Sequence, residues 1–114
     1  MSLFNTLFRS RSATSDNVEV LEVEDFKKAV HMNKVQLVDV RTYREFKGGH
    51  IARALNIDYF KREAFFQEFE KMDKTKPVYL YCRSGNRSNN AAHQLAARGF
   101  EKVYDLKGGI LRWK

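Results

Sequence analysis

The chain has 114 residues, of which 43% are hydrophobic and 31% charged, as expected for one compact globular domain and not for a disordered or fibrous protein. Its single cysteine excludes an internal disulfide, and three scattered histidines exclude a closed zinc site. The apolar runs are shorter than the roughly 20 residues that cross a bilayer. We therefore expect a soluble protein with no transmembrane segment and a cytoplasmic location.

The formal net charge of +7 is unevenly distributed along the chain. Residues 61–114 carry twelve basic and six acidic residues, whereas residues 18–60 carry seven of each. The basic half also holds the cysteine, which favours a small anionic substrate or an anionic partner. Nucleic acid is the competing interpretation, but the basic residues are spread out and no aromatic RNA-binding motif is present. We therefore predict no nucleic-acid binding.

Residues 1–17 differ in composition from the rest and are expected to be an N-terminal extension. A short apolar run precedes Arg9 and Arg11, the reverse of the order in a secretory signal peptide. The favoured interpretation is a loosely packed extension. The alternative is an amphipathic membrane anchor or a transit peptide, because the apolar residues would share one helical face: Leu3, Phe4, Leu7 and Phe8.

From residue 18 onward, short β-branched runs alternate with amphipathic helical stretches, and we assign this part to a single domain, 18–114. The patterns predict strands at 18–21, 35–40, 54–57, 78–81 and 103–105. They predict helices at 24–32, 61–72 and 88–98, with short turns at 43–47 and after residue 108. Gly99 should end the third helix, with Phe100 supplying the apolar contact that follows. This alternation predicts an α/β fold with a mainly parallel sheet.

The segment CRSGNRS, residues 82–88, joins the buried strand at 78–81 to a helix and is the strongest candidate site. Ligands of parallel α/β sheets bind beyond the carboxyl ends of the strands, where Cys82 lies. Backbone N–H groups at a helix N-terminus form an anion nest, and the same nest favours a nucleophilic thiolate. Arg83 and Arg87 add positive charge, and Gly85 permits a positive φ. We therefore predict a reactive thiol and not a buried structural cysteine.

Other polar residues have supporting roles or none in this interpretation. Asp39 ends the neighbouring strand, where Arg83 could pair with it and fix the loop, and Arg41 is expected to be structural, behind the site. His50 lies in a turn, so we expect it to satisfy backbone groups and not to act as a general base. His31 and His93 should be exposed and have no assigned role.

Three segments resemble the rhodanese domain of sulfurtransferases: LVDVRTYREFKGGHIARALNI (37–57), VYLYCRSGNRS (78–88) and LKGGILRW (106–113). The resemblance covers residues 18–114 and implies a five-stranded parallel sheet with helices on both faces. It implies that Cys82 accepts a sulfane sulfur from thiosulfate or a persulfide and passes it to cyanide, a thiol or a sulfur-carrier protein, without a metal or organic cofactor. Further implied roles are pairing of Arg83 with Asp39 and a loop lined by Ser84, Asn86, Arg87 and Ser88.

Two other functions of the same fold stay open at this point. Related phosphatases place five residues between cysteine and arginine, whereas four separate Cys82 from Arg87, which favours sulfur over phosphate. Non-catalytic binding modules typically lose the cysteine, which this chain keeps. The loop lacks the Cys-Gly opening of mercaptopyruvate-specific relatives, so that donor is not expected. The chain ends one residue after Trp113, earlier than many relatives, which suggests a minimal terminal helix or a truncated C-terminus.

Overall fold

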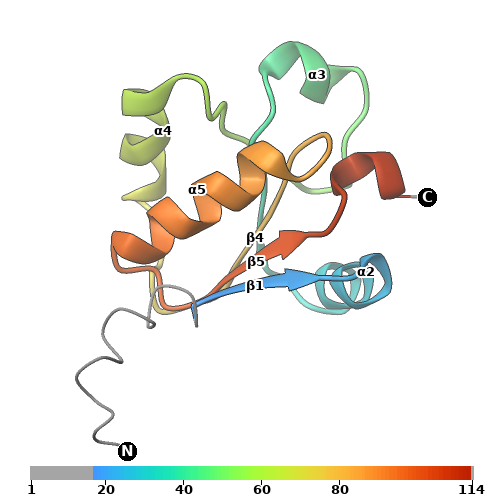
Figure 1. Ribbon diagram of the computed structural model, residues 1–114, viewed down its shortest axis with the longest axis horizontal. Helices are drawn as coiled ribbons and strands as arrows, with labels where there is room; N and C mark the ends of the chain where they lie inside the picture. The colour runs from blue at the N-terminus through green and yellow to red at the C-terminus, as the bar shows by residue number, and fades with distance from the viewer. Residues whose placement is uncertain (1–16, 114) are drawn as a thin grey trace, which may run out of the picture.

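The computed structural model describes residues 17–113, which form a parallel sheet covered by helices (Figure 1). Of the predicted N-terminal extension, residues 1–17, the structure describes Asn17. The predictions for residues 1–16 lie outside the described residues. The elements in chain order are β1 (Val18–Leu21), α2 (Val23–Met32), β2 (Gln36–Asp39), α3 (Tyr43–Lys47), β3 (Leu55–Asn56), α4 (Arg62–Phe69), β4 (Val78–Tyr81), α5 (Asn86–Ala97), β5 (Val103–Leu106) and the 3-10 helix η1 (Gly109–Arg112). Within the described part of the chain, no helix is long and apolar enough to span a membrane.

The sheet has five parallel strands in the order β1-β5-β4-β2-β3, so the predicted α/β fold with a parallel sheet is confirmed. Strand β4 is central, flanked by β5 and β2, and all strands end at the same edge of the sheet (Figure 1). The chain segments that follow β2, β4 and β5 therefore meet at one edge.

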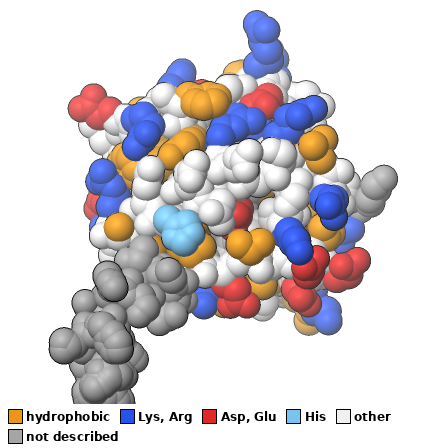
Figure 2. Space-filling model, viewed as in Figure 1, with side chains coloured by type: hydrophobic (Ala, Val, Ile, Leu, Met, Phe, Trp, Pro, Cys, Tyr) orange, Lys and Arg blue, Asp and Glu red, His pale blue; other side chains and the backbone are white. Residues whose placement is uncertain are grey.

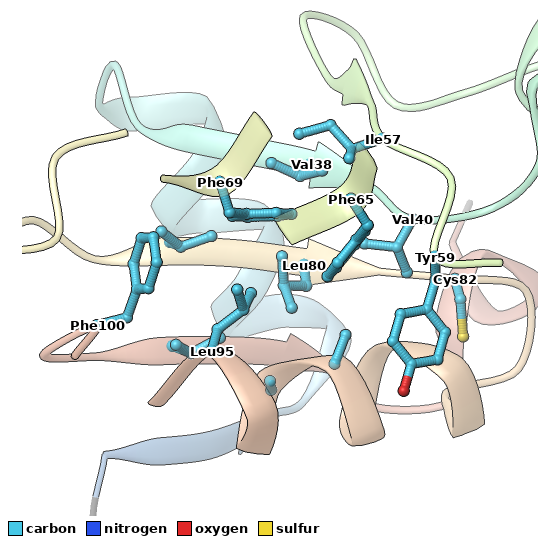
Figure 3. Packing of buried hydrophobic residues seen from close by; sticks show 14 residues of the cluster. Val38, Val40, Ile57, Tyr59, Phe65, Phe69, Leu80, Cys82, Leu95 and Phe100 are labelled. Carbon is cyan, nitrogen blue, oxygen red and sulfur yellow. The ribbon is translucent and has the colours of Figure 1, made fainter. Parts of the chain in front are cut away.

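Side chains on the two faces of the sheet form two separate cores. On one face, Val38, Leu80 and Val103 pack against α4 and α5, whose phenylalanine, alanine and leucine side chains fill the space shown in Figure 3. On the other face, Leu37 and Tyr81 pack with Phe26 and Val30 of α2, with Ile110 of η1 and with Trp113, which follows η1. Because strand side chains alternate between faces, consecutive residues such as Leu37 and Val38 belong to different cores.

The predicted apolar faces of the helices pack toward the two cores, while several of the helix ends differ from the prediction. Helix α5 begins at Asn86 rather than at residue 88, because Gly85 with φ +109° serves as its N-cap. At its other end, Gly99 N–H donates to Ala96 O at 3.1 Å and Phe100 N–H to Leu95 O at 3.2 Å, which confirms the predicted glycine-dependent end. Helix α4 ends at Phe69, three residues earlier than expected.

Candidate active site

Cys82 is the first residue beyond β4, and its sulfur lies at the first turn of α5 (Figure 3). The residue is 1% exposed. Its Sγ accepts hydrogen bonds from Gly85 N–H at 3.1 Å, from Ser88 N–H at 3.3 Å and from Ser88 Oγ–H at 3.4 Å. Donors aimed at one sulfur stabilise negative charge on it, so the geometry suits a thiolate.

The backbone of the Cys82 loop is held from behind by η1. Ile110 N–H donates to Cys82 O at 2.9 Å, and Leu111 N–H donates to Arg83 O at 3.2 Å. These bonds turn two loop carbonyls toward η1, while the N–H groups of Gly85 and Ser88 point at the sulfur. The 3-10 helix therefore fixes the orientation of the peptides that surround Cys82.

Gly109 makes this contact possible, a role that its place in the predicted turn after residue 108 does not indicate. Its φ is +68°, and a Cβ built on it would lie 2.3 Å from Arg83 O and 2.7 Å from Cys82 O. Both neighbours are backbone atoms, which cannot rotate away as a side chain would. Position 109 therefore excludes any side chain while the loop keeps this conformation.

Arg87 connects the loop to α3 through an ion pair that the sequence patterns do not predict. Its guanidinium donates to the two carboxylate oxygens of Glu45 at 2.9 and 3.0 Å. Glu45 also completes a capping box with Thr42 at the start of α3. The hydrogen bond from Arg87 lowers the pKa of Glu45 to about 2. The Thr-x-x-Glu spacing that starts at Thr42 is a sequence signal for the capping box, but it does not indicate that Glu45 pairs with Arg87.

The expected pairing of Asp39 with Arg83 is wrong, because Asp39 pairs with Arg41. Arg41 donates from Nε to Oδ1 at 2.9 Å and from Nη2 to Oδ2 at 2.7 Å, and its backbone N–H also reaches Oδ1 at 2.9 Å. Asp39 lies in register with Tyr81 and on the same sheet face as Leu37, whereas Cys82 belongs to the core of the opposite face. The loop continues into α5, and Arg83 is exposed.

Tyr81 and His50 stabilise the segment after α3 and do not contact the sulfur in the described hydrogen-bond network. The buried Tyr81 hydroxyl accepts from Ile51 N–H at 3.0 Å, and burial raises the pKa of Tyr81. His50 Nδ1 lies 3.0 Å from Phe46 O, and its ring stacks on Phe46 at 3.7 Å. The interpretation of His50 as a backbone partner is therefore confirmed.

The structure brings the predicted loop residues together but divides them into two groups. Cys82 and Ser88 are buried, and Gly85 and Arg87 are half-buried. Arg83, Ser84 and Asn86 are exposed on the outer side of the loop.

Lys and Arg side chains on the face with α5 are interspersed with acidic ones (Figure 2). Among residues 17–113, no group of three His, Cys, Asp or Glu side chains is placed to hold a metal ion.

The family model described as the rhodanese-like domain matches residues 22–114. The chain belongs to this family. It is 40% identical over 96 residues to the uncharacterized protein YqhL of Bacillus subtilis, covering 84% of this chain and 72% of that protein. It is 38% identical over 85 residues to the thiosulfate sulfurtransferase GlpE of Coxiella burnetii, covering 75% of this chain and 77% of that one.

A solved structure shows the same fold. The rhodanese-like domain protein from Staphylococcus aureus superimposes with a TM-score of 0.74 at 27% sequence identity, covering 84% of this chain and 91% of that one. The rhodanese-like fold is thus established by sequence and by structure, and the sulfurtransferase name of the Coxiella relative supports that chemistry at the level of the family.

Proposed function

We propose that this rhodanese-like protein is a sulfurtransferase that carries a sulfane sulfur on Cys82. The donor is thiosulfate or a persulfide, and the acceptor is cyanide, a thiol or a sulfur-carrier protein. The observation that carries the proposal is the set of donors converging on Cys82 Sγ from Gly85 and Ser88. The name of the Coxiella relative supports the same chemistry.

In the first half-reaction, the Cys82 thiolate attacks the outer sulfur of thiosulfate. The new S–S bond forms as the old one breaks, and the electron pair of the broken bond leaves on sulfite. Arg83, exposed beside the nucleophile, attracts the anionic donor. Arg87 contributes less net charge because Glu45 neutralises it at 2.9 Å, so its main role is to hold the loop on α3.

In the second half-reaction, the acceptor attacks the outer sulfur of the Cys82 persulfide. The S–S bond breaks and its electron pair returns to Cys82 Sγ, where the Gly85 and Ser88 donors stabilise the thiolate that leaves. Cyanide gives thiocyanate, and a thiolate gives its own persulfide. Because sulfite leaves before the acceptor attacks the Cys82 persulfide, the kinetics are ping-pong.

The length of the loop argues against a phosphatase. Four residues separate Cys82 from Arg87, and the first turn of α5 already begins within them, at Asn86. The N–H groups that point inward are aimed at one sulfur atom, at 3.1 and 3.3 Å. A phosphoryl group would need its own ring of donors beyond that sulfur.

Intact mass spectrometry tests the proposal directly. The purified protein is incubated with thiosulfate, and the expected product carries one added sulfur that cyanide removes as thiocyanate. Cys82→Ser should give no adduct, whereas Asn90→Ala is the control and should give the wild-type adduct, because Asn90 is an exposed side chain of α5 outside the loop. If wild type forms no adduct with thiosulfate or with glutathione persulfide, the proposal fails, and release of phosphate from a generic substrate would then indicate a phosphatase.

A further inference from the structure

The segment that leads into η1 lies against the Cys82 loop as closely as η1 itself does (Figure 1). The backbone of η1 donates two hydrogen bonds to carbonyls of the loop, as described above. Gly108, just before η1, contacts the loop further on, since a Cβ built on Gly85 would lie 3.5 Å from Gly108 N and 3.9 Å from Gly108 Cα. Gly85 N–H in turn donates to Cys82 Sγ at 3.1 Å. Gly108 is therefore a neighbour of a group that contacts the reactive sulfur.

The Arg112 side chain folds back over Gly108. A Cβ built on Gly108 would lie 2.5 Å from Arg112 Cγ, 3.4 Å from Cδ and 3.2 Å from Nε, so the stem and the start of the guanidinium run across this residue. Glycine at position 108 leaves the space that this side chain occupies. Arg112 is exposed. Its guanidinium therefore lies in solvent beside the Cys82 loop, with the Gly108 backbone between it and Gly85.

The positive charge of Arg112 is not neutralised by a neighbouring carboxylate. Within residues 17–113, its guanidinium forms no ion pair. The two segments that meet here, 82–100 and 106–113, contain no Asp or Glu. Arg87 differs, because its guanidinium donates to both oxygens of Glu45, at 2.9 and 3.0 Å. A guanidinium stays charged in neutral and mildly basic solution, so Arg112 adds a full charge to the field around the loop.

An unneutralised cation near a thiolate attracts anionic reagents and leaves neutral ones unaffected. The Coulomb energy is proportional to the charge of the reagent, and it is screened beyond about 30 Å at 0.01 M ionic strength but beyond about 3 Å at 1 M. The alternative role of Arg112 is packing, in which its methylene groups cover Gly108 and hold η1 on the loop. Packing would affect neutral and anionic reagents equally, so an experiment can separate the two roles.

We propose that Arg112 is a specificity-determining residue that favours anionic sulfur donors by attracting them to Cys82. It acts through its charge and forms no bond in the reaction. Arg83 supplies a second exposed cation on the loop, whereas Glu45 neutralises the charge of Arg87. The inference rests on the proposed function for the identity of the donor, and it deepens that function because it selects charged donors such as thiosulfate over neutral ones.

Alkylation of Cys82, the only cysteine, tests this attraction. Iodoacetate carries one negative charge and iodoacetamide carries none, so the ratio of their rate constants measures attraction separately from the reactivity of the thiolate. At about 0.01 M ionic strength, Arg112→Met should lower this ratio about two- to fivefold, with little change in the iodoacetamide rate. Arg112→Lys, which keeps the charge, should keep most of the wild-type ratio. An unchanged ratio in Arg112→Met, or equal slowing with both reagents, overturns the proposal.

Arg98→Met is the matched control, because it removes the same charge at the opposite end of α5 from the loop. Its ratio should equal that of wild type, and an equal fall in both variants would refute a role for this one position. The wild-type protein provides a test that needs no substitution. A thiolate by itself repels iodoacetate, so screening that repulsion would raise the ratio, whereas screening an attraction lowers it. The ratio should therefore fall when the ionic strength is raised from about 0.01 M to about 1 M, and a ratio that stays constant or rises also refutes the proposal.

Thiosulfate carries two negative charges, so Arg112→Met should slow the formation of its Cys82 adduct by about the square of the factor found with iodoacetate. In turnover with cyanide, the effect should appear as a higher KM for thiosulfate with little change in kcat. If wild type forms no adduct while the alkylation ratio falls as expected, the proposed function fails and the attraction of anions by Arg112 stands. If the adduct forms and Arg112→Met leaves its rate unchanged, this inference fails and the proposed function stands.

Discussion

Replacing Gly109 with alanine should damage the Cys82 loop far more than an ordinary turn substitution does. The new Cβ would lie 2.3 Å from Arg83 O and 2.7 Å from Cys82 O, so the two segments must separate. Separation breaks the hydrogen bonds that Ile110 and Leu111 donate to those carbonyls, at about 1 kcal/mol each. A non-glycine residue at φ +68° adds about 1–2 kcal/mol. The free energy of unfolding should therefore fall by about 3–4 kcal/mol.

Gly108→Ala is the matched control for this substitution. Its φ is +77°, and the nearest atom to a Cβ there is Arg112 Cγ at 2.5 Å, in a flexible side chain that can rotate away. We expect it to lose only the backbone cost of about 1–2 kcal/mol. Urea denaturation gives both free energies, and mass spectrometry gives the rate of sulfur addition to Cys82 under conditions where both variants are folded. Equal stability losses and equal sulfuration rates in the two variants would refute the argument that η1 orients the loop.

Three other substitutions test the contacts around the site. Asp39→Ala should destabilise the protein by about 3–5 kcal/mol, because it leaves Arg41 buried without its partner. Arg83→Ala, at an exposed residue, should change the unfolding free energy by less than about 0.5 kcal/mol. Equal losses in the two variants would instead support the pairing of Asp39 with Arg83. Glu45→Gln should cost about 1–2 kcal/mol at pH 7, measured by urea denaturation. Because folding lowers the pKa of Glu45 from 4.5 to about 2, its contribution is complete above pH 4.5 and is lost as the pH falls toward 2. If the unfolding free energies of wild type and Glu45→Gln fall equally between pH 4.5 and about 2, this assignment is wrong.

The features that the sequence predicted correctly depend on local structure. The central strand 78–81 was predicted to the residue, because a continuous apolar run bounded by Pro77 and the CRSGNRS loop has few other conformations available. The positive φ of Gly85 and the glycine at the end of α5 were likewise predictable, since each involves residues within one turn. The placement of Cys82 at the carboxyl end of a central parallel strand followed from the same local patterns.

The sequence alone determined the order of strands and helices along the chain, the position of the cysteine at the end of β4 and the resemblance to the rhodanese domain. Only the tertiary structure decided which cation pairs with which carboxylate, because Arg87 and Glu45 are 42 positions apart. It also decided that Asp39 and Cys82 belong to opposite faces of the sheet and that Gly109 lies against the loop carbonyls. The physical reason is that these contacts join separate strand ends, whose proximity comes from the order of the strands in the sheet and not from their spacing along the chain.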